Sequence, residues 1–215
     1  TDQIISTSRG TIYDSTGKTL AISTPTDTVT INPKKIVANT PEETKAKKEK
    51  VAKAFSDIFE LNYDETLEKV NSTSNVQTIA KKVDKTKIDE LKSWMEEEKI
   101  STGINIDEDT KRVYPYNNLA SNLIGFCGTD NTGIQGIEDS WNKVLQGTPG
   151  KLTTSTDAIR EEIPDSNQTY IPAENGSDIV LTLDFNIQTI LEKYLKQAVE
   201  ENHADSGTVV ALAPS

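Results

Sequence analysis

Two serine–lysine pairs in this chain have the spacing of a nucleophile and its base. Ser140 and Lys143 form a literal S-x-x-K element within "GIQGIEDSWNKVLQG" (133–147), and Ser15 and Lys18 form a second one. Such an element supports acyl transfer when the lysine, one helical turn after the serine, accepts the hydroxyl proton. That chemistry requires a desolvated lysine whose pKa is lowered by burial.

The periodicity around Ser140 argues against this chemistry. At about 100° per residue, the stretch 137–145 is predicted to form one helix, with Ser140 on its flank and Lys143 facing water. The buried side of this helix is expected to consist of Ile137, Trp141, Val144 and Leu145. Ser15 and Lys18 lie in a predicted hairpin turn, and the chain contains no K-T-G or K-S-G tripeptide to help form an acyl pocket. We therefore expect no catalytic residue in this chain.

Composition excludes several other kinds of site. The formal net charge of −11 disfavours binding to nucleic acid, which is driven by counterion release from phosphates. Cys127 is the only cysteine and His203 the only histidine, so an internal disulfide and a Cys/His zinc site are excluded. We expect no metal or other cofactor. No apolar run is long enough to cross a bilayer, so any membrane anchor is expected outside these residues.

The chain opens with β patterns and continues with helical ones. Strands are predicted at 11–13 and 19–23, joined by a turn with Gly17 in the left-handed conformation, and alternation resumes between Pro25 and Pro33. Residues 34–103 are predicted to form a small helical insert. Its helices are expected to begin after the N-caps Thr40, Asn62 and Asp84, with Pro41 and Glu43 completing a capping box at the first.

The remaining residues mix β and helical patterns. In order, we expect a strand or hairpin (103–115), a short helix (117–125), a loop (127–136), the helix 137–145, Thr-rich β segments (148–184), a helix (185–202) and a buried strand (207–215). The predicted fold class is therefore α+β, with mixed sheet segments and a small helical head insert.

Four stretches, in order along the chain, resemble motifs of one protein family. They are "RGTIYDSTGKTLA" (9–21), "RVYP" followed by "LASNLIGF" (112–126), "GIQGIEDSWNKVLQGTPGKL" (133–152), and "DIVLTLDFNIQTILEKYL" (178–195) with "GTVVALAP". Together they resemble the N-terminal, non-catalytic module of class B penicillin-binding proteins, membrane-anchored transpeptidases that crosslink bacterial peptidoglycan. The insert resembles the head of such modules by position and helical character only. Ser15 departs from the family, which more usually has a basic residue there, so a charge role at this position is in doubt.

The resemblance implies which residues hold the module together. Carried over position by position, they are Arg9, Gly10, Asp14, Arg112, Tyr114, Pro115, Gly133, Gly136, Glu138, Leu145, Gly147 and Gly150. Of 23 basic Lys and Arg residues only Arg9, Arg112 and Arg160 are arginines, and arginine offers a planar fork that lysine lacks. We expect Glu138 to pair with Arg9 or Arg112, with a bidentate contact available, while the glycines permit close backbone approach.

The resemblance also implies an architecture and a role. It implies an elongated pedestal over 1–183, with 34–103 as its head insert, and the start of a truncated transpeptidase domain at 184–215. Such a module is expected at the extracytoplasmic face of the bacterial cell membrane, in a parent that is anchored by a segment outside this chain and acts through a serine outside it. Its expected partners are the parent's own transpeptidase domain and other cell-wall synthesis proteins, such as a membrane glycosyltransferase.

Two rival interpretations are kept. One is that this chain itself is acylated by a penicillin through Ser140 and Lys143. The other is a free-standing extracellular adhesion or ligand-binding module, which the acidic, Thr- and Asn-rich composition favours.

Overall fold

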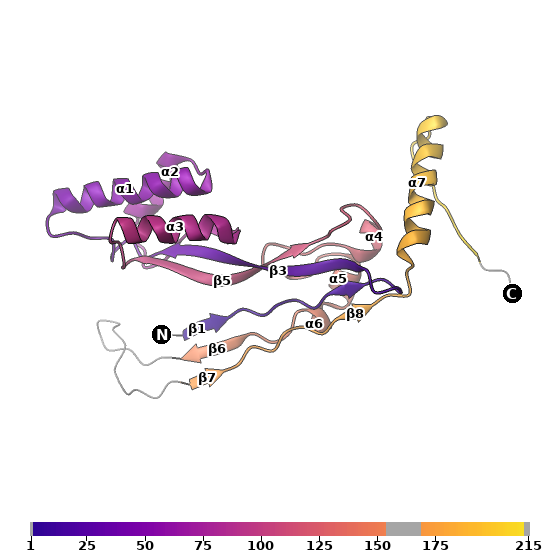
Figure 1. Ribbon diagram of the computed structural model, residues 1–215, viewed down its shortest axis with the longest axis horizontal. Helices are drawn as coiled ribbons and strands as arrows, with labels where there is room; N and C mark the ends of the chain where they lie inside the picture. Colours follow the sequence, from indigo (N-terminus) through magenta and orange to yellow (C-terminus); the bar gives the residue numbers. More distant parts are fainter. Residues whose placement is uncertain (1, 154–168, 213–215) are drawn as a thin grey trace. The chain divides into compact units, whose positions relative to one another are not determined.

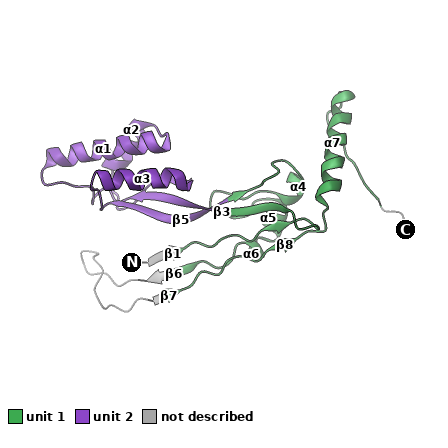
Figure 2. Cartoon of the chain, viewed as in Figure 1, with its two compact units in different colours: residues 1–23, 112–215 green, residues 24–111 purple. Residues whose placement is uncertain are grey.

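The chain has an α+β fold that divides into two compact units. The computed structural model describes residues 2–153 and 169–212, which form helices and two sheets (Figure 1). Unit 1 comprises Thr1–Ser23 and Arg112–Ser215, and unit 2 comprises Thr24–Lys111 (Figure 2). The predicted fold class is confirmed, and unit 2 encloses the predicted insert 34–103 together with the strand residues on either side of it.

Unit 2 places helices against an antiparallel sheet. Its helices are α1 (Pro41–Phe59), α2 (Tyr63–Asn71) and α3 (Lys85–Glu97), and its sheet pairs β3 (Thr19–Ile31) with β4 (Gln77–Val83) and β5 (Ile104–Val113). The predicted capping box begins α1, because the Thr40 hydroxyl accepts from the Glu43 amide and the Glu43 carboxylate accepts from the Thr40 amide. The apolar faces of α1 and α3 and the strands share one core, with Val29, Val51, Phe55, Ile88 and Leu91 almost fully buried.

Two features of unit 2 differ from the sequence prediction. Residues 77–83 form the strand β4, so the insert is not purely helical, since pairing with β3 outweighs the weak local pattern. Strand β3 also continues through Pro25, where a break was expected. Proline is tolerated there because it lies between Ala21, which pairs with β2, and Asp27, which pairs with β4.

The described residues of unit 1 form a three-stranded sheet, one end of the five-stranded sheet that also contains β4 and β5, and four helical segments. One sheet has the order β1 (Asp2–Ile5), β6 (Gly150–Thr153) and β7 (Thr169–Ile171), all antiparallel. In the other, β2 (Ile12–Tyr13) pairs antiparallel with the start of β3 and parallel with β8 (Ile179–Val180), so the sheet is mixed as predicted. The helical segments are α4 (Ser121–Ile124), α5 (Gly136–Ser140), α6 (Asn142–Leu145) and α7 (Phe185–Glu201). Their apolar side chains share a core with Ile12, Leu20 and Ala21.

Two predictions for unit 1 are wrong. The stretch 137–145 is not one helix, because Trp141 (φ −107°, ψ 19°) separates α5 from α6. Trp141 and Val144 are therefore exposed, whereas Glu138 and Leu145 are fully buried. The described part of the predicted strand at 207–215, residues 207–212, is not a strand, and Val210 and Leu212 are exposed. A strand needs a partner for its backbone hydrogen bonds, and no strand in the described ranges pairs with this segment. Within those ranges, no helix has the length and hydrophobicity of a bilayer span.

We predict that Phe55→Ala destabilises unit 2 by about 3 to 5 kcal/mol, because it leaves a cavity where a buried ring now stacks on Phe59. Urea denaturation followed by far-ultraviolet circular dichroism measures this change. Tyr63→Ala, at an aromatic residue that is 39% exposed, is the control and should change stability by less than about 1 kcal/mol. Equal effects of the two substitutions would contradict the position of the core.

Candidate functional site

The serine–lysine pair lacks the environment that nucleophilic catalysis requires. Ser140 ends α5, Lys143 belongs to α6, and both residues are exposed. The exposure of Lys143 was expected, whereas Ser140 was expected on the flank of a helix. The pair therefore lacks the desolvated setting that such chemistry requires. Among residues 2–153 and 169–212, no group of three or more His, Cys, Asp or Glu side chains is arranged to hold a metal ion.

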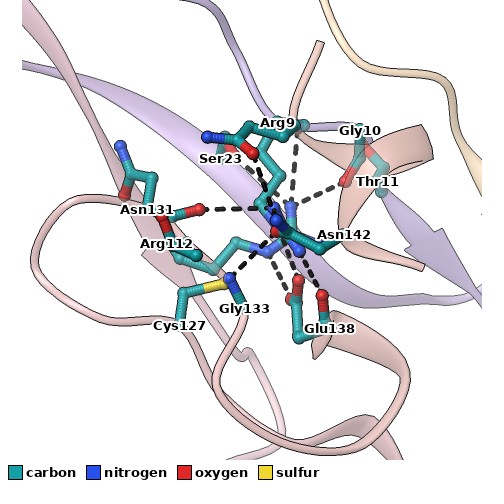
Figure 3. Close-up of polar contacts among 12 residues, drawn as sticks. Arg9, Gly10, Thr11, Ser23, Arg112, Cys127, Asn131, Gly133, Glu138 and Asn142 are labelled. Carbon is teal, nitrogen blue, oxygen red and sulfur yellow. Dashed lines mark hydrogen bonds and ion pairs between the residues drawn. The ribbon is translucent and has the colours of Figure 1, made fainter. Parts of the chain in front are cut away.

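The motif residues instead converge on one buried carboxylate. Glu138, in α5, is fully buried, and its Oε2 lies 2.6 Å from Arg9 Nε while its Oε1 lies 2.7 Å from Arg112 Nε (Figure 3). Tyr114 Oη donates a further hydrogen bond to Oε1 at 3.2 Å. We call Arg9, Arg112, Tyr114 and Asn142 around Glu138 the Glu138 cluster. The structure thus contains both pairings that were expected as alternatives.

The two guanidinium groups do more than neutralise Glu138. Arg9 Nη2 donates to the backbone oxygen of Glu138 at 2.6 Å, and Arg9 Nη1 donates to Asn142 Oδ1 at 2.6 Å. Arg112 Nη1 donates to the Gly10 carbonyl at 2.7 Å. Neither arginine forms the expected bidentate contact with the carboxylate, because each offers only Nε to it. The Nη1 of each arginine donates to another segment, whereas Arg112 Nη2 is buried without a hydrogen-bond partner among the described residues. Each guanidinium group therefore links Glu138 to another segment of the chain.

The electrostatics of the cluster keep Glu138 ionised. Burial by itself acts to raise the pKa of Glu138, but the guanidinium groups of Arg112 and Arg9 outweigh it and hold the pKa below the ordinary value. Burial and the negative charge of Glu138 raise the pKa of Tyr114. The same two causes raise the pKa of the Cys127 thiol to about 11, so this thiol is a poor nucleophile at neutral pH. The cluster is suited to holding segments in place and not to proton transfer.

Glycines allow the backbone to approach this cluster closely. Gly133 donates its amide to Asn142 Oδ1 at 3.0 Å, and a Cβ at Gly133 would lie 2.0 Å from the Glu138 carbonyl oxygen. A Cβ at Gly10 would lie 2.0 Å from the Ser177 carbonyl oxygen. A Cβ at Gly136, Gly147 or Gly150 would likewise lie 2.5 Å or less from a backbone atom of another segment. The predicted glycines are therefore places where no side chain fits.

Asp14 forms a second polar centre, apart from the Glu138 cluster. Its buried carboxylate accepts from the amides of Thr16 (2.8 Å), Lys18 (2.7 Å) and Phe185 (2.9 Å). Burial acts to raise the pKa of Asp14, but the hydrogen bonds, that from the Phe185 amide having the largest effect on the pKa, lower it to about 2. Asp14 therefore fixes the β2–β3 turn and also holds the first residue of α7.

The other predicted residues have simpler places. Leu145 is fully buried in the unit 1 core, and Pro115 is an exposed turn residue. Arg160 lies outside the described residues. Sequence reasoning missed Asn142, which bridges Arg9 and Gly133, and Gly176, where a Cβ would lie 1.7 Å from the Leu145 carbonyl oxygen. The glycine in "ENGSD" was an available signal for Gly176, whereas nothing local distinguishes Asn142 from a surface residue.

Comparison with known proteins gives consistent matches over nearly the whole chain. The family described as "Penicillin-binding Protein dimerisation domain" matches residues 4–181. Stage V sporulation protein D of Bacillus subtilis is 29% identical over 96% of this chain and 30% of its own length. Peptidoglycan D,D-transpeptidase FtsI of Buchnera aphidicola is 32% identical over 95% of this chain and 34% of its own length. The chain thus spans about a third of the length of the curated relatives it matches.

A solved structure shows the same fold. A penicillin-binding protein, PBP2, from Helicobacter pylori, solved in a complex with MreC, matches with a TM-score of 0.67 and 20% identity. The match covers 92% of this chain and 38% of that one.

We predict that Glu138→Gln destabilises unit 1 by roughly 3 to 5 kcal/mol, because it leaves two buried guanidinium groups without a counter-charge. Urea denaturation followed by tryptophan fluorescence measures this loss in a Trp94→Phe background, where Trp141 is the remaining tryptophan. Asp139→Asn, at the exposed neighbouring position, is the matched control and should change stability by less than about 1 kcal/mol. A loss at Glu138 as small as that of the control would show that the carboxylate is solvated.

We also predict that unit 1 loses stability in acid. The folded pKa of Asp14, about 2, lies below its ordinary value of 3.8, so its contribution is present above pH 3.8 and is lost as the pH falls toward 2. The pKa of Glu138 is also lowered in the folded protein, so protonation of Glu138 in acid reduces the stability of unit 1 as well. Thermal unfolding measured from neutral pH down to pH 2 gives the profile, and Asp14→Asn should flatten it in the acid range. An Asp14 carboxyl that titrates by NMR at 3.8 or above would contradict the prediction.

Proposed function

The chain belongs to the penicillin-binding protein dimerisation domain family, and from this membership we propose that it is the positioning module of a membrane-anchored peptidoglycan D,D-transpeptidase. One observation carries the proposal. The chain matches only about a third of the length of relatives that are named as peptidoglycan D,D-transpeptidases. Its own motif residues form a buried structural cluster and do not pair a nucleophile with a base. The work of the module is then to hold another domain in place, and positioning is a large factor in reactions between bound polymer strands.

The division of labour within the chain follows from this proposal. Residues 1–183 are the pedestal, with 34–103 as its head insert, and residues 184–215 begin a transpeptidase domain whose reactive serine lies outside this sequence. Sequence similarity to the relatives continues past the family match at residue 181, which supports this boundary. The proposed location is the extracytoplasmic face of the bacterial cell membrane, where peptidoglycan is crosslinked.

The proposed partners are other proteins of cell-wall synthesis. The Helicobacter pylori PBP2, which shares the fold of this chain, was solved in a complex with MreC. This supports a module that offers surfaces to such proteins, and a membrane glycosyltransferase is a further proposed partner. Only the composition favoured the adhesion alternative, and none of the matched proteins reported above is named as an adhesion module.

Labelling with a penicillin tests the proposal. We expect intact-protein mass spectrometry to find no covalent penicillin adduct on this 215-residue chain. A longer protein that contains it should gain the mass of one penicillin, on a serine after residue 215. An adduct on Ser140 would overturn the non-catalytic role, and a longer protein that takes up no penicillin would overturn the transpeptidase assignment. Ser140→Ala is the control, and it should leave labelling of the longer protein unchanged.

A further inference from the structure

Helix α7 is attached to unit 1 with little help from apolar burial. None of its residues is buried, and Ile187, Ile190 and Tyr194 each expose more than half of their surface. An open groove of about 440 Å³ lies between α7 and the α4 segment, with Leu123 on one side and Leu191 and Leu195 on the other. Tight side-chain packing therefore does not set the direction of this helix.

The first attachment is at the N-terminus of α7. The Phe185 amide donates to Asp14 Oδ2 at 2.9 Å, so a carboxylate from the β2–β3 turn holds the first helical residue. The Phe185 ring lies 3.8 Å from Lys18 Nζ and 4.4 Å, between ring centroids, from Tyr116. These contacts fix one end of the helix to the hairpin.

The second attachment lies two turns further along. Glu192 Oε1 accepts a hydrogen bond from the Ala120 amide at 2.7 Å, across the groove. Gln188 Nε2 donates a second hydrogen bond to the same oxygen at 2.8 Å. Ala120 has φ 50° and ψ 29°, a left-handed conformation that is unfavourable for a residue with a Cβ. Glu192 lies seven positions after Phe185, so the two attachment points are about 10 Å apart along the helix axis.

Two separated points determine the direction of a rigid helix, whereas one point leaves it free to pivot. We propose that Asp14 and Glu192 form a two-point clamp on α7, with Asp14 as the pivot and Glu192 as the point that can be released. Asp14 is buried and accepts from three backbone amides, while Glu192 is half-buried and reaches over a groove. The functional meaning of the clamp rests on the proposed function. If α7 leads into the transpeptidase domain, Glu192 is a positioning residue that sets how the pedestal carries that domain.

Residual dipolar couplings of backbone amides test the clamp in this chain, because they report the orientation of a helix and not only its stability. In the wild type we expect the couplings of α7 and of the unit 1 strands to fit one alignment of the same magnitude. Glu192→Ala should shift the ratio of clamped to released helix by about tenfold, the effect of losing one charge-assisted hydrogen bond. The couplings of α7 should then shrink while those of β2 and β3 stay unchanged.

Two control variants separate the clamp from a general effect on the helix. Glu192→Gln keeps an oxygen that accepts from the Ala120 amide, so it should retain most of the wild-type couplings. Glu201→Ala removes an acceptor whose hydrogen bond, among the described residues, comes from Gln197 within α7, and it should leave the couplings unchanged. Wild-type α7 couplings already averaged below those of the strands, or unchanged couplings in Glu192→Ala, would overturn the clamp. The two proposals can fail separately. If the orientation of α7 depends on Glu192 but the longer parent takes up no penicillin, the clamp is supported and only the proposed function is overturned.

Discussion

The fold of unit 1 depends on one carboxylate shared between two arginines that are distant in sequence. Glu138 lies 129 residues from Arg9 and 26 residues from Arg112, and each arginine binds a different oxygen of it. Two cations and one anion leave an excess of positive charge in the interior, and the carbonyl oxygens of Gly10, Asn131 and Glu138 help to solvate it. A buried ion cluster is favourable only when its donors and acceptors are largely paired, and Arg112 Nη2 is the one guanidinium nitrogen left without a partner among the described residues.

A residue of this cluster also joins the two positions at which the chain leaves unit 1 and returns to it. Ser23 is the last residue of unit 1 before unit 2, and Arg112 is the first residue after it. Arg112 Nη1 lies 3.3 Å from Ser23 Oγ, so the two ends of the insertion are held together by a residue of the cluster.

The two units reach stability by different means. Among the described residues, sixteen buried apolar residues form the core of unit 2, whereas six form that of unit 1. Unit 1 has correspondingly less apolar burial to hold it together and relies on the Glu138 cluster, on Asp14 and on backbone segments that meet at glycines. Such contacts are directional, which suits a module whose proposed work is to hold another domain in a fixed orientation.

The sequence by itself determined the features that depend on neighbouring residues. These include the capping box at Thr40, the turn at Gly17, the helix ends at Asn62 and Gly125, and the exposed position of Lys143. It also narrowed the partners of Glu138 to two arginines, with help from the family resemblance. Local signals suffice there because caps, turns and helical periodicity act over a few residues.

Only the tertiary structure decided the contacts between distant segments. It showed that both arginines share Glu138, that Asn142 supports Arg9, that Asp14 holds the Phe185 amide, and that the helix expected at 137–145 breaks at Trp141. The helical pattern there assigned Trp141 to the buried side and gave no sign that Glu138 would be buried. The physical reason is that burying Glu138 is favourable only when Arg9 and Arg112, which are distant in sequence, pair with it in the folded chain. The residues next to Glu138 do not indicate that pairing.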